Sequence, residues 1–305
     1  MIELMEARMR VTGNEICLTL DRIIVATDFT PTSEPAMDYA RAMAKRFCAG
    51  LTVAHVIDLS IATRSEVSVV GLAIDKMRND SADNMSRVTS ECIAAGVRTA
   101  GRTIEAHNPA KAIVNLAKEL EADLIVMGTG ARHGLNKFIF GSCAEGVIHH
   151  AICPVITIGP NSKKSADEIF NLETIVFATD LRHDVIEKAA IALAFAQDSI
   201  AKIYMCHVLK NSNKEFPDMA DERYMSELEL RRLIPISAYE WCNPQCIVEL
   251  GNAAPHIIDL ARGKGADLIV LGAKRETAYF THLSEGVIGR VLAEAQCPVM
   301  TICTD

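Results

Sequence analysis

Short apolar runs alternate along the chain with longer stretches in which apolar residues recur at helical spacing. Runs such as residues 23–26 and 124–127 are bounded by Asp or Gly, which predicts strands buried on both faces of a sheet. The alternation of strands and helices predicts the α/β class, with an open parallel sheet and helices on both faces. The expected helices cover residues 33–48, 70–96, 109–120 and 141–151, and then residues 182–197, 220–236, 253–264 and 285–295.

The pattern occurs twice, because the second half of the chain repeats short sequences of the first half in the same order. A long internal repeat indicates a duplicated structural unit. We divide the chain into an N-terminal extension (1–21), a first domain (22–160), a polar linker (161–172) and a second domain (173–305). The matching pairs are ATD at 26–28 and 178–180, HV at 55–56 and 207–208, the segments 104–109 and 248–253, ADLIV at 122–126 and 266–270, and CPV at 153–155 and 297–299.

Composition and charge narrow the class of protein. Half of the residues are hydrophobic and 5% are aromatic, a balance typical of helices packed on a parallel sheet. A net charge of −8 argues against a nucleic-acid-binding protein, which needs clustered Lys and Arg. The extension 1–21 has no apolar core of a signal peptide, and we expect a cytoplasmic protein. The ten cysteines are then buried thiols in a reducing compartment, and Cys242 with Cys246 lacks the partners of a zinc site.

Candidate chemistry lies beyond the carboxyl ends of the strands, where open parallel sheets hold their ligands. Asp28, Val56 and the loop after Gly128 fall at such ends. Glycines in this loop let backbone N–H groups approach an anion, and Gly141-Ser142 stands where the next helix begins. Arg132 and Lys137 add positive charge. The alternatives are a phosphate-binding loop and an ordinary glycine-rich connection, and the combined context favours phosphate.

With these motifs the chain resembles the universal stress protein family in its tandem form. The resemblance covers both halves through the first-strand Asp, the His-Val strand end, the Ala-Asp-Leu-Ile-Val strand and the Cys-Pro-Val closing strand. It implies two tandem open parallel-sheet sandwiches of the Rossmann-like type, similar to the adenine nucleotide alpha hydrolases. It also implies a stress-response role, with ATP, ADP or AMP as the ligand, with or without Mg²⁺.

Nucleotide-binding members of this family hold the phosphates in a loop of the form G-x2-G-x9-G-[ST]. Carried onto this chain, the glycines fall on Gly128, Ala131 and Gly141, and the hydroxyl residue is Ser142. Ala131 departs from the pattern, and Gly130 stands one residue early. By the same resemblance Asp28 holds the ribose or adenine side. The implied cofactor-binding set is Ala26, Asp28, Val56, Met127, Gly128, Gly130, Ala131, Gly141, Ser142 and Cys143.

Two points in this assignment stay open. Asp28 has an alternative role as a cap of the helix that follows Thr30. In the second half, the ungapped register places Glu285 opposite Gly141. At an effective dielectric of about 20, a like charge about 4 Å from a phosphate costs about 4 kcal/mol, whereas a helix terminus contributes roughly 0.3–1 kcal/mol. The second half is therefore expected not to hold ATP in the usual manner.

Catalytic patterns are absent from the sequence. It contains no G-x4-GK-[ST], no G-x-S-x-G and no H-E-x-x-H motif, and no base is identifiable for Ser142, so we expect no catalytic residues and no bound metal other than Mg²⁺. Three hypotheses follow: a nucleotide-binding stress-response module, an interaction protein of the same fold without nucleotide, and an ATP-using hydrolase or ligase. The first is preferred, with unknown protein partners.

The closing strands suggest how the halves assemble. Residues 154–158 and 298–302 are short, β-rich and last in each repeat, so each is expected at a sheet edge. The family commonly associates through that edge. We expect an intrachain pseudo-dimer with these strands adjacent and antiparallel, and a homodimer of whole chains as a weaker possibility.

Overall fold

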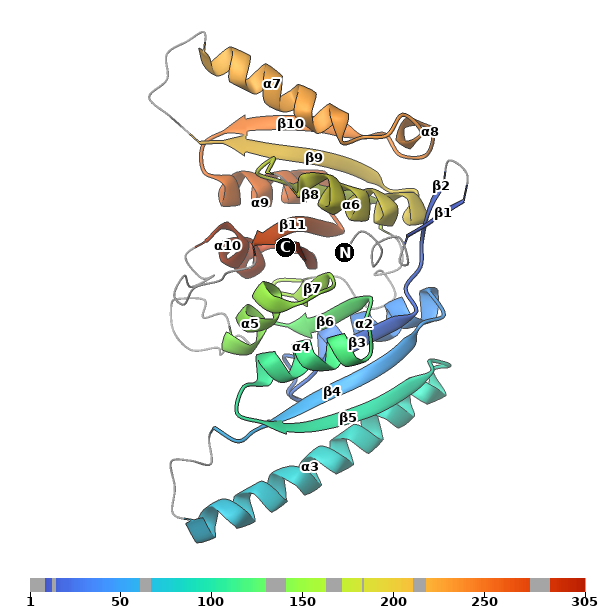
Figure 1. Ribbon diagram of the computed structural model, residues 1–305, viewed down its shortest axis with the longest axis vertical. Coiled ribbons are helices and arrows are strands. Elements are labelled where there is room, and N and C mark those ends of the chain that lie inside the picture. Colours follow the sequence, from blue (N-terminus) through green and yellow to red (C-terminus); the bar gives the residue numbers. More distant parts are fainter. Residues whose placement is uncertain are drawn as a thin grey trace. The chain divides into compact units, whose positions relative to one another are not determined.

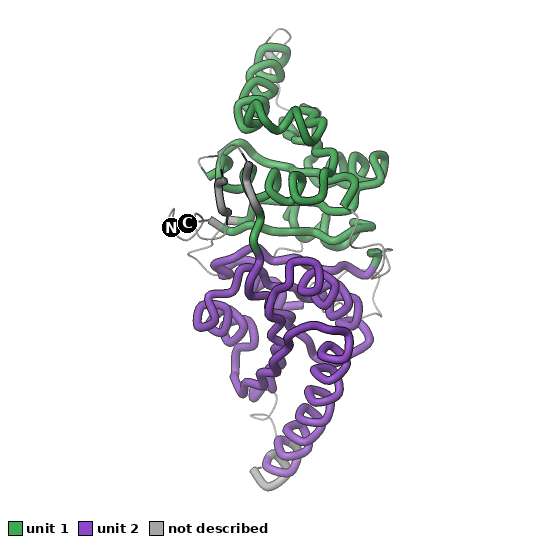
Figure 2. The backbone as a smooth tube through the Cα atoms, turned by 90° about the vertical axis from the view of Figure 1, so that its right-hand side faces the viewer, with its two compact units in different colours: residues 1–19, 161–305 green, residues 20–160 purple. Residues whose placement is uncertain are grey.

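The computed structural model describes residues 9–12, 15–60, 67–129, 141–162, 172–182, 184–210, 218–274 and 286–304. Contacts divide the chain into two compact units, which are coloured separately in Figure 2. We call residues 20–160 the N-terminal unit, and residues 161–305 together with 1–19 the C-terminal unit.

The N-terminal unit is a parallel sheet covered by helices (Figure 1), as the alternating pattern predicted. The strand order is β7-β6-β3-β4-β5, and every pairing is parallel. The order reverses direction between β3 and β6, which makes their carboxyl ends the switch point of this unit. The elements are β3 (Arg22–Ala26), α2 (Glu34–Arg46), β4 (Gly50–Asp58), α3 (Val67–Ala94), β5 (Thr99–Ala106), α4 (Pro109–Glu119), β6 (Leu124–Gly128), α5 (Ser142–His150) and β7 (Val155–Ile158).

The C-terminal unit repeats this plan, with the strand order β10-β9-β8-β11-β12 and parallel pairing throughout. It also contains the first residues of the chain, where an antiparallel hairpin packs through β2 against α6. The elements are β1 (Met9–Thr12), β2 (Glu15–Leu18), β8 (Thr174–Ala178), α6 (Val185–Ser199), β9 (Lys202–Leu209), α7 (Asp218–Arg232), α8 (Ala238–Trp241), β10 (Gln245–Leu250), α9 (Ala253–Lys264), β11 (Leu268–Lys274), α10 (Val287–Glu294) and β12 (Val299–Thr304).

The central strands are buried on both faces, as their continuous apolar runs predicted. In β3, Ile23, Ile24 and Val25 are at most 1% exposed, and the matching residues of β8 are fully buried. The backbone N–H groups at the start of these strands need a hydrogen-bond acceptor, because a buried polar group is costly to leave unpaired. The Asp of the repeated Ala-Asp-Leu-Ile-Val sequence supplies it.

Asp123 and Asp267 perform the same task in the two units. One carboxylate oxygen of Asp123 accepts the backbone N–H groups of Asp21 and Arg22, both at 2.8 Å. Asp267 accepts those of Glu173 and Thr174 at 2.6 and 2.8 Å. Each aspartate thereby joins the start of one central strand to the start of its neighbour, which places the carboxyl ends of both strands side by side.

Candidate functional site

Asp28 stands in the connection between β3 and α2, two residues beyond the end of the strand. One of its carboxylate oxygens accepts the backbone N–H of Thr30 at 3.0 Å and the Thr30 hydroxyl at 2.6 Å. Helix α2 begins at Glu34, and its N-cap is Ser33. The alternative role of Asp28 as the helix cap is therefore wrong, because the carboxylate closes a turn onto Thr30 before the helix starts.

The Asp28 carboxylate is stabilised in its ionised form. Burial raises its pKa, but the donated hydrogen bonds from the hydroxyl and backbone N–H of Thr30, with a smaller contribution from Ser33, outweigh burial and hold the pKa below its ordinary value. The turn uses one carboxylate oxygen for Thr30, and a carboxylate can accept further hydrogen bonds. Asp28 is thus an ionised carboxylate that Thr30 holds in place and that can accept further hydrogen bonds.

A histidine that the sequence analysis noted only as part of a repeat holds this turn in place. Nδ1 of His55 lies 2.9 Å from the carbonyl oxygen of Thr27, so this nitrogen donates the hydrogen bond. The imidazole also contacts the ring of Phe29, with 4.6 Å between ring centroids. Phe29 has a φ of 58°, a left-handed conformation that is costly for an aromatic residue. The contacts from β4 therefore stabilise the strained turn that positions Asp28.

An apolar surface adjoins the turn at the ends of the central strands. Ala26 pairs in register with Met127 on one side and with Ala54 on the other. Residues in register point to the same face of a sheet, and Val56 shares that face because it stands two residues beyond Ala54. Ala26 and Met127 are 7% and 4% exposed, and Val56 is half-buried. The predicted base-lining residues are thus brought together beside Asp28.

Gly128 and Gly141 frame the base of the predicted phosphate loop. A Cβ on Gly128 would lie 3.2 Å from the backbone oxygen of Thr32, so the strand end and the Asp28 turn are in close contact. The N–H of Gly141 donates to the carbonyl of Thr129 at 3.0 Å, which closes the loop at its base. Gly141 is the N-cap of α5, as the sequence predicted. Gly130 and Ala131, with Arg132 and Lys137, lie outside the described residues.

The start of α5 faces the same space as Asp28. Burial raises the pKa of the Cys143 thiol to about 11, and the negative charges of Asp28 and Asp58 add to that rise. These charges act on the sulfur because the first turn of α5 lies near the ends of β3 and β4. Ser142, the first residue of the helix, is exposed. The structure thus brings the described part of the predicted set to one edge of the sheet.

The C-terminal unit keeps the turn but not its surroundings. Nδ1 of His207 donates to the Thr179 carbonyl at 2.8 Å, and Leu181 has a φ of 57°, so the strained turn is repeated. The carboxylate of Asp180, however, forms an ion pair with Arg182 at 2.8 Å. The aspartate that corresponds to Asp28 is therefore engaged by a cation from its own turn.

A buried lysine packs against Gly272 of β11, the residue that corresponds to Gly128. A Cβ on Gly272 would lie 2.9 Å from Cδ and 3.0 Å from Nζ of Lys188, whose side chain is 7% exposed. The ammonium donates to the carboxylate of Asp184 at 2.5 Å. At the equivalent place, Gly128 meets the backbone of Thr32. The burial of Lys188 leaves no signal in the sequence, because the i,i+4 spacing of Asp184 and Lys188 resembles that of an ordinary exposed helix pair.

The helix starts refine the predicted register of the second half. The C-caps Ala151 and Ala295 follow the ungapped register, but α10 has Gly286 as its N-cap and begins at Val287. Gly286, and not Glu285, therefore stands at the cap position that Gly141 holds in the N-terminal unit. Glu285 directly precedes this cap and lies outside the described residues.

Among the described residues, no helix is long and apolar enough to cross a membrane, and no three His, Cys, Asp or Glu side chains form a metal-binding group.

Comparisons with known proteins agree with the repeat. The model of the universal stress protein family matches residues 19–159 and again residues 171–302. A universal stress protein of Methanocaldococcus jannaschii is 32% identical over 145 residues, which are 47% of this chain and 84% of that protein. A protein of Staphylococcus saprophyticus, also named as a universal stress protein, is 34% identical over 46% of this chain and 84% of its own length.

A solved structure shares the fold over both units. The crystal structure of a universal stress protein from Archaeoglobus fulgidus covers 92% of this chain and 98% of its own, with a TM-score of 0.69 and 19% identity. The family match extends over nearly the whole length of each repeat. The chain belongs to the universal stress protein family, of which it carries two copies in tandem.

Proposed function

We propose that the N-terminal unit binds ATP or a related adenine nucleotide at the carboxyl ends of β3, β4 and β6. The observation that carries the proposal is the fixed, ionised Asp28 carboxylate between an apolar surface and the start of α5. A nucleotide needs these three elements together: an acceptor for its sugar hydroxyls, an apolar surface for its base, and backbone donors for its phosphates.

Each described residue has a role in this proposal. Asp28 accepts hydrogen bonds from the ribose or the adenine amine. Ala26, Val56 and Met127 contact the base. The hydroxyl of Ser142 and the free N–H groups of the first turn of α5 donate to the phosphates, and the helix dipole favours the anion. Asp28 and Asp58 add negative charge nearby, which favours binding of the nucleotide together with Mg²⁺.

We assign this site to binding and signalling and not to catalysis. Nucleophilic catalysis needs a deprotonated or base-activated group next to the phosphates. The thiol at the start of α5 is held in its protonated form by a pKa of about 11. Ser142 then serves as a hydrogen-bond donor to phosphate. The C-terminal unit is assigned no nucleotide, because Arg182 forms an ion pair with Asp180 and Lys188 packs against Gly272 of β11.

Mass spectrometry under native conditions tests the proposal on the full chain purified without added ligand. We expect a mass increment of ATP, ADP or AMP, and calorimetry of the stripped protein should give one nucleotide per chain. A chain that carries no nucleotide and gives no heat with ATP would instead be an interaction protein of the same fold. Release of phosphate from ATP at rates typical of enzymes would favour the hydrolase or ligase hypothesis.

A further inference from the structure

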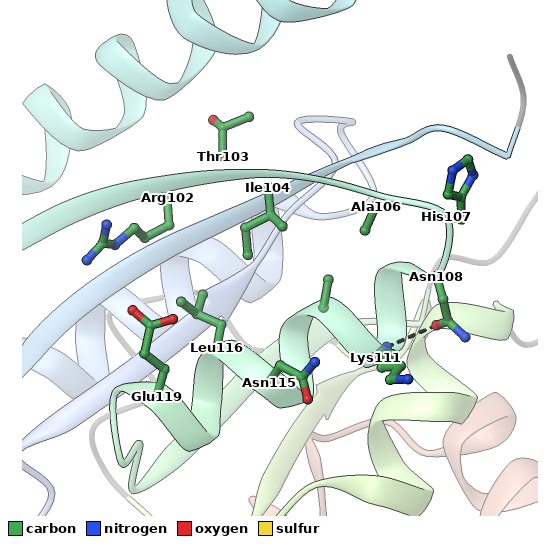
Figure 3. A pocket seen from close by; sticks show the side chains of 11 residues that line it. Arg102, Thr103, Ile104, Ala106, His107, Asn108, Lys111, Asn115, Leu116 and Glu119 are labelled. Carbon is green, nitrogen blue, oxygen red and sulfur yellow. Dashed lines mark hydrogen bonds between the residues drawn. The ribbon is translucent and has the colours of Figure 1, made fainter.

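A second concave feature lies on the N-terminal unit, away from the residues assigned to nucleotide. It is a groove of about 520 Å³ between strand β5 and helix α4 (Figure 3), which is within the range of ligand sites. None of the ten residues assigned to nucleotide lines it. The lining residues are Arg102, Thr103, Ile104, Ala106, His107, Asn108, Lys111, Ala112, Asn115, Leu116 and Glu119.

The groove has an apolar floor and polar walls. Figure 3 shows Ile104 of the strand and Leu116 of the helix pointing toward each other across its middle. Lys111, Asn115 and Glu119 are spaced by four residues, so they form a row along one side of α4. On the strand side, Arg102 and Ile104 point to the groove, because alternate residues of a strand share a face. The floor can therefore accept an apolar side chain, and the walls can accept polar ones.

Two cations of the groove wall have no charged or hydrogen-bonding partner for their side chains among the described residues. Neither the guanidinium of Arg102 nor the ammonium of Lys111 forms an ion pair or hydrogen bond with any described residue. Figure 3 places Arg102 with Glu119 at one end, and Lys111 with His107 at the other. A chain of net charge −8 thus presents a groove with two Lys or Arg side chains and one carboxylate. The Lys111 end, which has no opposing carboxylate in the wall, favours an anion.

The outer edge of β5 offers backbone groups for pairing. The carbonyls of Arg98 and Ala106 accept N–H groups of Leu51 and Leu59 on the β4 side, at 2.8 and 3.0 Å. In the parallel pairing of β5 with β4, the even-numbered residues of β5 point their backbone N–H and C=O groups at β4. The odd-numbered residues between them point these groups the other way. The backbone groups of Thr99, Gly101, Thr103 and Glu105 therefore face away from β4, along the edge that borders the groove.

We propose that this edge and groove bind an extended acidic peptide segment of a partner protein, which adds to β5 as a further strand. Its backbone pairs with the outward groups of β5. Alternate side chains then stand opposite Arg102, Ile104 and Ala106, about 6.6 Å apart. At the outer positions Arg102 and Lys111 attract a carboxylate, against the repulsion of Glu119 at the Arg102 end, and the apolar floor accepts an apolar residue between them. The recognised pattern is acidic, any, apolar, any, acidic.

A labelled heptapeptide, Thr-Glu-Thr-Val-Thr-Glu-Thr with blocked ends, tests the proposal on the full chain at low ionic strength by fluorescence anisotropy. We expect it to bind, and the Lys-for-Glu version not to bind. Lys111→Gln should weaken binding by about two- to fivefold, and Glu119→Gln should strengthen it by a similar factor, as is typical of exposed charge pairs. Lys118→Gln removes an exposed charge from the same helix outside the groove, and should change nothing.

Hydrogen exchange followed by NMR distinguishes strand addition from capture of an anion by side chains alone. Bound peptide should slow exchange of the amides of Gly101 and Thr103, whose N–H groups face outward, while those of Arg102 and Ile104 are already protected by β4. Three results would overturn the proposal: equal binding of the acidic and basic peptides, binding without protection of the outward amides, and displacement of the peptide by inorganic phosphate at matched ionic strength.

Discussion

At the scale of single residues, the two units differ in the environment of one repeated aspartate. Thr30 donates to Asp28 and keeps it ionised, whereas Arg182 pairs with Asp180. We expect Asp28→Ala to weaken ATP binding about tenfold or more, because a hydrogen bond to a charged group contributes about 1.5–3 kcal/mol. Asp180→Ala should leave the stoichiometry measured by calorimetry unchanged. Equal losses from the two substitutions would contradict the assignment of one functional unit.

Gly141 provides a second test at this scale. Its φ of −69° is open to any residue, so Gly141→Glu should fold. The new carboxylate would stand at the start of α5 near the proposed phosphates, and about 4 kcal/mol of repulsion corresponds to a loss of affinity of roughly a thousandfold. Circular dichroism checks the fold and calorimetry checks the affinity. Gly141→Gln is the neutral control, and unchanged ATP affinity in the Glu variant would remove the phosphate assignment.

Cys143 gives a pH-dependent readout of the same space. A pKa of about 11 leaves little thiolate at neutral pH, and alkylation requires the thiolate. The rate of alkylation by iodoacetamide should therefore rise about tenfold per pH unit up to that pKa. Peptide mapping by mass spectrometry measures this rate. Cys48, which is exposed and not buried as the sequence analysis expected, is the internal reference. If Cys143 is labelled as fast as Cys48 at neutral pH, burial and the carboxylates of Asp28 and Asp58 do not raise the pKa of the Cys143 thiol.

Single residues also show where sequence reasoning ends. The positions of Asp28 and Gly128 follow from the ends of apolar runs, so their meeting at one edge is predictable. The hydrogen bond from His55 to Thr27 is not, since a histidine in a strand has many possible partners. Lys188 is harder still, because its burial against Gly272 depends on how α6 lies over β11. These contacts are set by tertiary packing and leave no local pattern.

At the scale of elements, the Asp of each Ala-Asp-Leu-Ile-Val strand has a measurable role. Asp123→Ala leaves the N–H groups of Asp21 and Arg22 without their acceptor, and should lower the free energy of unfolding by about 1–3 kcal/mol. Asp267→Ala should act alike on the C-terminal unit. Urea unfolding measures both. Asp259→Ala removes an exposed carboxylate as a control, and an equally large effect there would contradict the proposed role.

Periodicity predicted the bounds of the long helices better than the short N-terminal strands or the spaces between elements. Helix α9 has the predicted bounds, 253–264, and α3 covers residues 67–94 against the predicted 70–96. The N-terminal hairpin was missed, because its strands are four residues each and the extension mixes charged and apolar residues. The groove beside β5 was missed as well. It depends on the distance between a strand and a helix, whereas periodicity reports only which face of each is apolar.

At the scale of the whole molecule, the duplication gives two copies of one fold that differ in the side chains around the repeated turn. The repeated features are those that build the sheet, which the repeated sequence segments predicted, and the strained turn, which the structure added. The differing features are the side chains around that turn. The altered side chains of the C-terminal unit have partners within that unit, since Asp180 pairs with Arg182 and Lys188 pairs with Asp184.

Assembly of the two units is the last prediction. Within its own unit, β7 pairs with β6 and β12 pairs with β11, so each closing strand ends its strand order. An apolar edge favours pairing, and the linker keeps the two edges at high effective concentration. We expect the strands to lie adjacent and antiparallel in a pseudo-dimer.

We call the expected contact between β7 and β12 the seam. A carboxylate introduced there should separate the units, because it cannot be hydrated once the strands are packed together. The double variant Val155→Asp, Val299→Asp should show a larger radius of gyration by small-angle scattering, and two unfolding transitions in place of one. Val25→Asp, in the centre of one sheet, is the control that should lose helical signal in circular dichroism, since it disrupts a core and not an edge. A double variant that matches the parent in scattering profile and unfolding cooperativity would refute the seam.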